Sequence, residues 1–465
     1  MKRQEADEGT GAAARRVPGR GLLRTLAVLV LAALYPASGA IGGGTFEGVA
    51  SCAGSTCYGR AEGNGAVVRQ DEIATWQEPS SPSGAHSRAY AVLGGRRGQQ
   101  IAASLGLGNA QSAPACLGCH ATNAPAGQRG AKFTLTDGVG CESCHGPSGG
   151  GWLAEHYALP ATHASNVAAG LTALESPRVR AGVCLDCHYG SAKPGQFVTH
   201  AMMAAGHPRI SFELDLFSAL QQHHNLDADY ARRKGSLSSV RLWAVGQAEA
   251  VRRSTSLFAQ PKFAYEGAFP QFTFLDCHSC HRQITDGPSR KLTFETNPER
   301  PIPFGNPPFN DENMILLQAV ANALAPGEAA AFQTAVRAFH HAMGAGPAET
   351  RAAAQALSGR AGALSDALSG RAYGEADAFR VIGIIAGEAT APRFTDYAGS
   401  VQAVMAIDTL LNALVREGRV TQGAAAGIRG DIARAYKAVE EPNAYRPADF
   451  RAALKSAAGA IGRLQ

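Results

Sequence analysis

The chain has 465 residues, of which 45% are hydrophobic and 17% charged, and its formal net charge is +5 at pH 7. Residues 1–40 hold six of the basic and three of the acidic side chains, so the rest of the chain carries 37 basic and 35 acidic ones. Such a balance leaves no basic surface for a phosphate backbone, and it argues against nucleic-acid binding.

The N-terminus has the pattern of a secretory signal peptide. Four arginines between residues 15 and 24 precede an apolar run over 26–34, and small residues suited to cleavage follow over 36–40. A run of about ten apolar residues is too short for a permanent membrane span. We expect residues 1–40 to be removed on export to the periplasm, with an uncleaved anchor as the alternative. We expect no further membrane span.

Residues 41–115 are glycine-rich and loop-like. They contain a first pair of cysteines, Cys52 and Cys57, which are four residues apart and are followed at once by Tyr58. His86 follows a Pro/Ser/Gly turn and precedes an apolar stretch over 90–105 that we expect to be helical.

Between residues 116 and 297 a Cys-x-x-Cys pair is followed directly by histidine four times. This spacing places two thiols on one rim of a porphyrin and brings the next imidazole beneath the ring to the iron, so it predicts four covalently attached c-type haems. Zinc sites and disulfides also use paired cysteines, but neither explains a histidine after every pair. The predicted haem-attaching thiols are Cys116, Cys119, Cys141, Cys144, Cys184, Cys187, Cys277 and Cys280, and the predicted proximal iron ligands are His120, His145, His188 and His281.

The pair Cys52 and Cys57 allows three interpretations. It is a variant motif that carries a fifth haem, with Tyr58 as proximal ligand or with no protein ligand. It is a relic whose thiols form a disulfide in an oxidising compartment. Or the thiols are free or bind a metal.

Each haem iron needs a sixth ligand or an open position. Fourteen histidines leave ten beyond the motifs, which favours two histidines per iron, low reduction potentials and electron transfer. Histidines in short segments near a motif can cross a haem face. The predicted distal ligands are therefore His86, His163, His200 and His207, with His223 and His224 as weaker candidates and His156, His278, His340 and His341 weaker still.

The fold is predicted to be mainly α. Residues 116–297 form the multihaem domain, with short helical pieces broken by glycine and proline and with a core of stacked haems that supplies much of the folding free energy. Residues 298–310 are a proline-rich linker. Residues 311–465 are alanine-rich and are expected to form a bundle of five or six helices, with Pro347 and Pro447 in first turns and Gly418 and Gly430 at helix ends or starts.

Three segments resemble multihaem cytochromes of the cytochrome c-554 type: Val139 to Pro147 around Cys141-Glu-Ser-Cys-His145, Thr162-His163-x-x-Asn166, and Ala205-Gly-His207-Pro208. The resemblance extends over about residues 51–282. It implies a mainly helical fold with closely stacked haem pairs and one-electron transfer, and it suggests His86, His163 and His207 as distal ligands. Tyr58 departs from it, because a histidine is expected there, and the C-terminal bundle lies outside it.

The sequence therefore predicts a periplasmic electron carrier with four haem c groups, and a fifth if Cys52 and Cys57 carry one. The expected partners are periplasmic or membrane-bound redox proteins, with no membrane contact except through such a partner. The alternative is a multihaem reductase in which one five-coordinate haem acts on a small nitrogen or sulfur oxo-species. Fold alone does not separate the two.

Overall fold

The computed structural model describes residues 44–63, 68–209, 211–281, 300–303, 305–392, 394 and 397–465. About 60% of the structure is helical, and the described residues form isolated bridges, such as that between Thr45 and Gly149, but no β-strand. The prediction of a mainly α fold is confirmed. The expected signal peptide, residues 1–40, lies outside the described residues.

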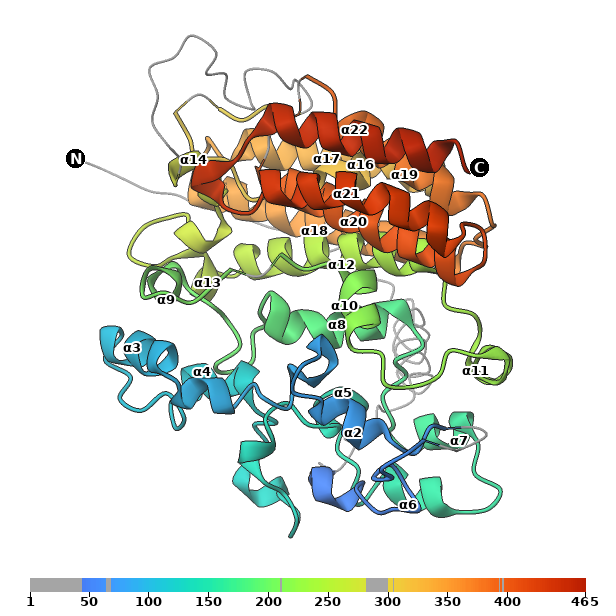
Figure 1. Cartoon of the computed structure of the whole chain (residues 1–465). Coiled ribbons are helices and arrows are strands. Elements are labelled where there is room, and N and C mark those ends of the chain that lie inside the picture. The colour runs from blue at the N-terminus through green and yellow to red at the C-terminus, as the bar shows by residue number, and fades with distance from the viewer. Residues whose placement is uncertain are drawn as a thin grey trace, which may run out of the picture. The chain divides into compact units, whose positions relative to one another are not determined.

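The motif-bearing region is built from short helices that glycine and proline interrupt (Figure 1). Helix α7, for example, begins with a capping box in which the Thr162 hydroxyl accepts from the backbone N–H of Ser165 over 3.0 Å. The helices up to the third motif are α2 (Glu72–Gln77), α3 (Arg96–Ser104), α4 (Pro114–His120), α5 (Glu142–His145), α6 (Trp152–Tyr157), α7 (His163–Ala168) and α8 (Pro177–His188). They are followed by α9 (His200–Ala204), α10 (Leu214–Leu220), α11 (Ala228–Lys234), α12 (Ser239–Ala259), α13 (Pro261–Ala264) and α14 (Cys277–Cys280).

Short 3₁₀ helices connect these elements. They are η1 (Val49–Ser51), η2 (Pro82–Gly84), η3 (Ala91–Gly94), η4 (Ala126–Gln128), η5 (Leu135–Asp137), η6 (Phe272–Phe274) and, in the C-terminal region, η7 (Pro442–Ala444). Tight turns of this kind suit a region where the chain reverses often.

Helix α12 is an exception to the expected short pieces, because it runs unbroken for 21 residues. It packs along α18 and also against α8, which carries the third motif (Figure 1). Helix α12 thus joins the motif-bearing region to the C-terminal helices.

The C-terminal region contains seven α-helices in the part that the structure describes, rather than five or six. Pro347 and Pro447 occupy first helical positions as predicted, and Gly418 follows a helix end with φ of +70°. Gly430 instead lies inside a helix. The helices are α16 (Ile315–Leu324), α17 (Pro326–Ala342), α18 (Pro347–Gly370), α19 (Asp377–Ala389), α20 (Tyr397–Arg416), α21 (Gln422–Ala438) and α22 (Pro447–Gly462).

The largest apolar core lies among these C-terminal helices and α12. It also includes Phe274 and Leu275, which come just before the fourth motif; the Phe274 ring lies 5.2 Å from that of Phe258 on α12. Only small clusters surround the other motifs, such as Leu93, Ala102 and Leu117 near the first. The fourth motif is therefore anchored in the bundle core.

One helix of the described chain, α20, is long and apolar enough to cross a membrane, contrary to our expectation of none beyond the N-terminus. Its most apolar window is 72% buried inside the structure, which is also typical of the central helix of a soluble bundle.

The predicted division at residues 298–310 stays a prediction, because residues 298, 299 and 304 lie outside the described part of the chain. The packing of α12 against α18 nevertheless shows that helices from both sides of this stretch share one core.

Candidate haem-binding sites

Each Cys-x-x-Cys-His motif coincides with the end of a helix. His120, His145 and His188 are the last residues of α4, α5 and α8, and His281 is the residue that caps α14. A first-turn proline opens α4 and α8, where its missing N–H leaves no unpaired donor. The backbone thus presents each histidine beside its two thiols.

Three of the motif histidines face one predicted distal ligand each. The ring centres are 6.2 Å apart for His120 and His207, 6.0 Å for His188 and His86, and 6.3 Å for His281 and His200. These partners are 81 to 102 residues apart in the sequence, and the fold brings them together.

The second motif faces two candidates. The ring centre of His145 lies 6.2 Å from that of His223 and 6.1 Å from that of His224. Ligand atoms of these three histidines all lie within 4.8 Å of one another, and no other such group of three or more His, Cys, Asp or Glu occurs among the described residues. A structural zinc site would gather four ligands, so this geometry does not support the zinc alternative.

The ring spacing fits an iron between the paired imidazoles. Two metal–nitrogen bonds of about 2 Å each, in line, separate the imidazole centres by roughly 6.3 Å. The four pairs show 6.0 to 6.3 Å. Residues at all four motifs therefore fit a haem held from both faces by histidine.

Hydrogen bonds fix which ring nitrogen is available. The Nδ1 atoms of His120, His207 and His223 each lie 2.8 Å from a backbone carbonyl oxygen, of Ala89, Pro208 and Gln221 respectively. A carbonyl only accepts, so each Nδ1 carries the proton and each Nε2 keeps its lone pair for a metal.

Burial favours the neutral form of three of the facing histidines. It lowers the pKa of His145 to about 3, with smaller contributions from the charges of His224 and His223. It likewise lowers the pKa of His188 to about 4 and that of His223 to about 4. A neutral imidazole is the form that binds iron.

His163 is the predicted distal ligand that does not face a motif histidine. Its Nε2 lies 3.0 Å from a carboxylate oxygen of Glu175. Among the weaker candidates, His278 packs between Tyr397 and Tyr445, and buried His340 lies 3.1 Å from Asp311.

His156, one of the weaker candidates, faces Tyr58. Its Nε2 is 2.9 Å from the phenol oxygen and the ring centres are 6.2 Å apart. A direct hydrogen bond joins the two side chains. Two ligand atoms of one metal are separated by about 4 Å, so these two atoms are closer together than in an occupied metal site.

Thiols of different motifs lie close to one another. All ten cysteines are free, and the thiol of Cys119 interacts with that of Cys187 as Cys52 does with Cys141. Burial raises the pKa of Cys144 to about 11 and that of Cys184 to about 12. Protonated thiols are poor zinc ligands.

A buried carboxylate holds the chain before α2 against the second motif. Glu142, between the two cysteines of that motif, accepts from the backbone N–H groups of Glu47, Gly48 and Ser148 over 2.8–2.9 Å and from the Ser148 hydroxyl over 2.6 Å. Four donors on one carboxylate fix the position of the motif.

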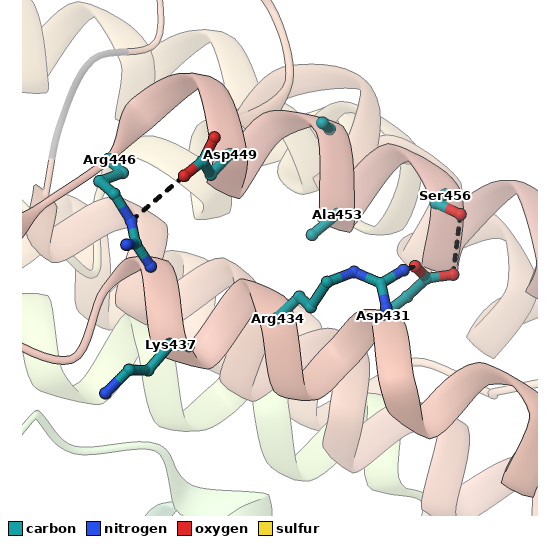
Figure 2. Close-up of a pocket in the computed structure, with 8 residues that line it drawn as sticks. Asp431, Arg434, Lys437, Arg446, Asp449, Ala453 and Ser456 are labelled. Carbon is teal, nitrogen blue, oxygen red and sulfur yellow. Dashed lines mark hydrogen bonds and ion pairs between the residues drawn. The ribbon is translucent and has the colours of Figure 1, made fainter.

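Two cavities differ in their relation to the motifs. One of about 70 Å³ is lined by His188, His207, Arg209 and Glu312 among others, and so lies beside the third motif. A larger groove of about 360 Å³ lies between α21 and α22 (Figure 2). Its cations are paired with carboxylates, as Arg446 is with Asp449 over 3.2 Å, so the groove offers no site for an anion.

Residues 70–146 match the family described as cytochrome c554 and c-prime. The match includes the first two complete motifs and His86. This segment is similar to that family. The match supports a c-type cytochrome that binds haem c covalently and carries electrons, and such cytochromes are typically extracytoplasmic. No curated protein and no solved structure matches the chain.

The match to cytochrome c554 covers 77 of the 465 residues, and it ends at Gly146. The third and fourth motifs and the C-terminal bundle lie outside it.

Proposed function

We propose that this cytochrome is a periplasmic electron carrier with four haems, one at each Cys-x-x-Cys-His motif. The observation that carries the proposal is the spacing of 6.0 to 6.3 Å between each motif histidine and a second histidine. The axial pairs proposed are His120 with His207, His188 with His86, His281 with His200, and His145 with His223 or His224.

The chain's own residues prepare these positions. The Nδ1–H bonds to backbone carbonyls orient His120, His207 and His223, and they make each ring a better donor through Nε2. Phe217 packs on His188 with ring centres 4.8 Å apart and keeps water from that face. When bound, haem supplies an iron that alternates between ferric and ferrous states.

Two histidines per iron favour the carrier over the reductase. A catalytic haem needs an open position for substrate, and each motif histidine in the described structure already faces another imidazole. Histidine on both faces also lowers the reduction potential relative to a methionine ligand.

Contacts between thiols of different motifs support a continuous path for electrons. The Cys119–Cys187 interaction places the first and third motifs close together, and Cys144 of the second motif raises the pKa of Cys184 in the third, which places these two motifs close together as well. Electrons would then enter and leave through periplasmic or membrane-bound redox proteins.

Export to the periplasm is part of the proposal. Its support is the basic and apolar pattern of residues 1–40 together with the extracytoplasmic location typical of the family.

The test is the haem content and spin state of the full chain, matured in a host that attaches haem covalently. We expect haem on the peptides of all four motifs and a wholly low-spin oxidised spectrum at those sites. Peptides without haem at these thiols would refute the proposal. Carbon monoxide binding to a motif haem after reduction would favour the reductase.

A further inference from the structure

The variant motif at Cys52 and Cys57 folds like a complete one. In the second and fourth motifs the N–H of the histidine donates to the carbonyl of the first cysteine, over 2.9 Å from His145 and 2.7 Å from His281. The N–H of Tyr58 donates in the same way to the carbonyl of Cys52, over 3.2 Å. The two additional spacer residues are accommodated by a turn in which the N–H of Cys57 donates to the carbonyl of Gly54 over 2.9 Å.

The residue after the second cysteine also faces a histidine, as in the other motifs. The ring centres of Tyr58 and His156 are 6.2 Å apart. The phenol oxygen of Tyr58 and Nε2 of His156 point at each other. Both atoms can bind iron.

His156 is supported like a metal ligand. The ring packs against Trp152 at 5.9 Å, and the Asn166 side chain, which is 6% exposed, lies near it. The amide oxygen of Asn166 is buried and makes no hydrogen bond to any described residue, so it is available to the Nδ1–H of His156. An Nδ1–H held by an oxygen leaves Nε2 directed at Tyr58.

The thiols of the variant motif are placed for attachment. Both are free, and Cys52 contacts Cys141 of the second motif, much as Cys119 of the first motif contacts Cys187 of the third. The variant motif therefore lies beside a complete one, in the relation that complete motifs have to each other.

We propose that Cys52, Cys57, Tyr58 and His156 form a fifth haem c site with a tyrosine–histidine axial pair. This inference rests on the proposed function and adds a fifth haem to the four proposed there. Attachment adds each S–H across a vinyl group: a carbon–sulfur bond forms, the proton goes to the other vinyl carbon, and nothing is oxidised or reduced overall.

The hydrogen bond between Tyr58 and His156 marks the place that iron would take. Iron would bind the phenol oxygen in place of its proton, which would leave to solvent, and Nε2 of His156 would be the second protein ligand. An anionic oxygen ligand stabilises ferric iron, so this site has the lowest potential of the five.

The experiment counts haems in the intact full-length protein by mass and by pyridine haemochrome. We expect five per chain, a haem adduct on the peptide with Cys52 and Cys57, and four in the C52S/C57S double variant. We expect Tyr58→His to keep five haems while removing the tyrosine-to-iron charge-transfer band. Tyr157→Phe, beside His156 but exposed, is the control and changes neither.

Four haems in the wild type, or a Cys52–Cys57 disulfide, would overturn the inference and leave the proposed function standing. Fewer than four would refute the proposed function itself. If the double variant fails to accumulate, the haem adduct on the wild-type peptide still decides the question.

Discussion

Arg253 on α12 donates from Nη1 to the carboxylate of Asp186 over 2.7 Å, and Asp186 lies between the two cysteines of the third motif. The same guanidinium donates to the carbonyl oxygens of Gly190 and Gly182, over 2.8 and 3.2 Å. One side chain from the bundle core thus holds the helix and the turn that present the third motif.

Replacing Arg253 with methionine should weaken this connection. The change removes three hydrogen bonds from a charged donor and leaves the carboxylate of Asp186 with Lys193 as its remaining partner. We expect a loss of about 2–3 kcal/mol in the free energy of unfolding and less haem at the third motif, measured by thermal denaturation and peptide mass. Arg232→Met, in an exposed pair with Asp229, should change stability by less than about 0.5 kcal/mol.

The variants His207→Ala and His163→Ala should have different effects, although the family resemblance suggests both histidines as distal ligands. His207 faces His120, so its loss should open one iron, give a high-spin signal and allow carbon monoxide to bind about one reduced haem. His163 meets Glu175, and its loss should leave the spectrum unchanged. The reverse result would contradict the pairing.

Gly118→Ala should disrupt the first motif. A Cβ at Gly118 would lie 2.4 Å from the carbonyl oxygen of Gly195, a backbone atom that cannot rotate away. We expect a cost of about 1–3 kcal/mol and reduced haem attachment. Gly182→Ala is the matched control within α8: no atom lies within 4 Å of its Cβ, and helix propensity should stabilise the protein by about 0.5–1 kcal/mol. Equal effects of the two changes would refute the steric account.

Glu213 should make stability depend on pH. The side chain is fully buried at the start of α10, and burial, followed by the charge of Asp215, raises its pKa above the ordinary value of 4.5. Above pH 4.5 the unfolded state releases a proton that the folded state keeps, so the free energy of unfolding falls as pH rises through this window.

Glu213→Gln removes that titration while its amide oxygen can still accept from the helix N-terminus. We therefore expect the stability difference between pH 5 and pH 8, from denaturant unfolding, to shrink in this variant. Glu78→Gln, at an exposed position, should behave like the wild type. An unchanged pH profile in the Glu213 variant would show that another group titrates.

The attachment motifs could be identified from the sequence because their chemistry is local: two thiols and an imidazole must lie within five residues. Partners across the haem face are not local. His156 lies 98 residues from Tyr58, and nothing in its neighbourhood in the sequence indicates that contact. His163 was favoured by its resemblance to the family pattern, yet in the fold it meets Glu175.

Helix α12 was missed for a different reason. Periodicity reveals a helix with one buried face, but α12 is buried on most sides, including Gln247 and Glu249 at 1% exposure each. Gly430 lies within α21 at an exposed position, where the absence of a side chain costs little packing. A glycine alone therefore did not mark a helix end.

The contact between Cys119 and Cys187 has a consequence for biogenesis. An oxidant that reaches the newly exported polypeptide first could crosslink these sulfurs, and one such bridge would block two attachment sites together. Haem attachment must then be faster than oxidation, or a reductant must keep the thiols reduced. The crosslinked protein would lack haem and be colourless, and its electrophoretic mobility would change on treatment with dithiothreitol.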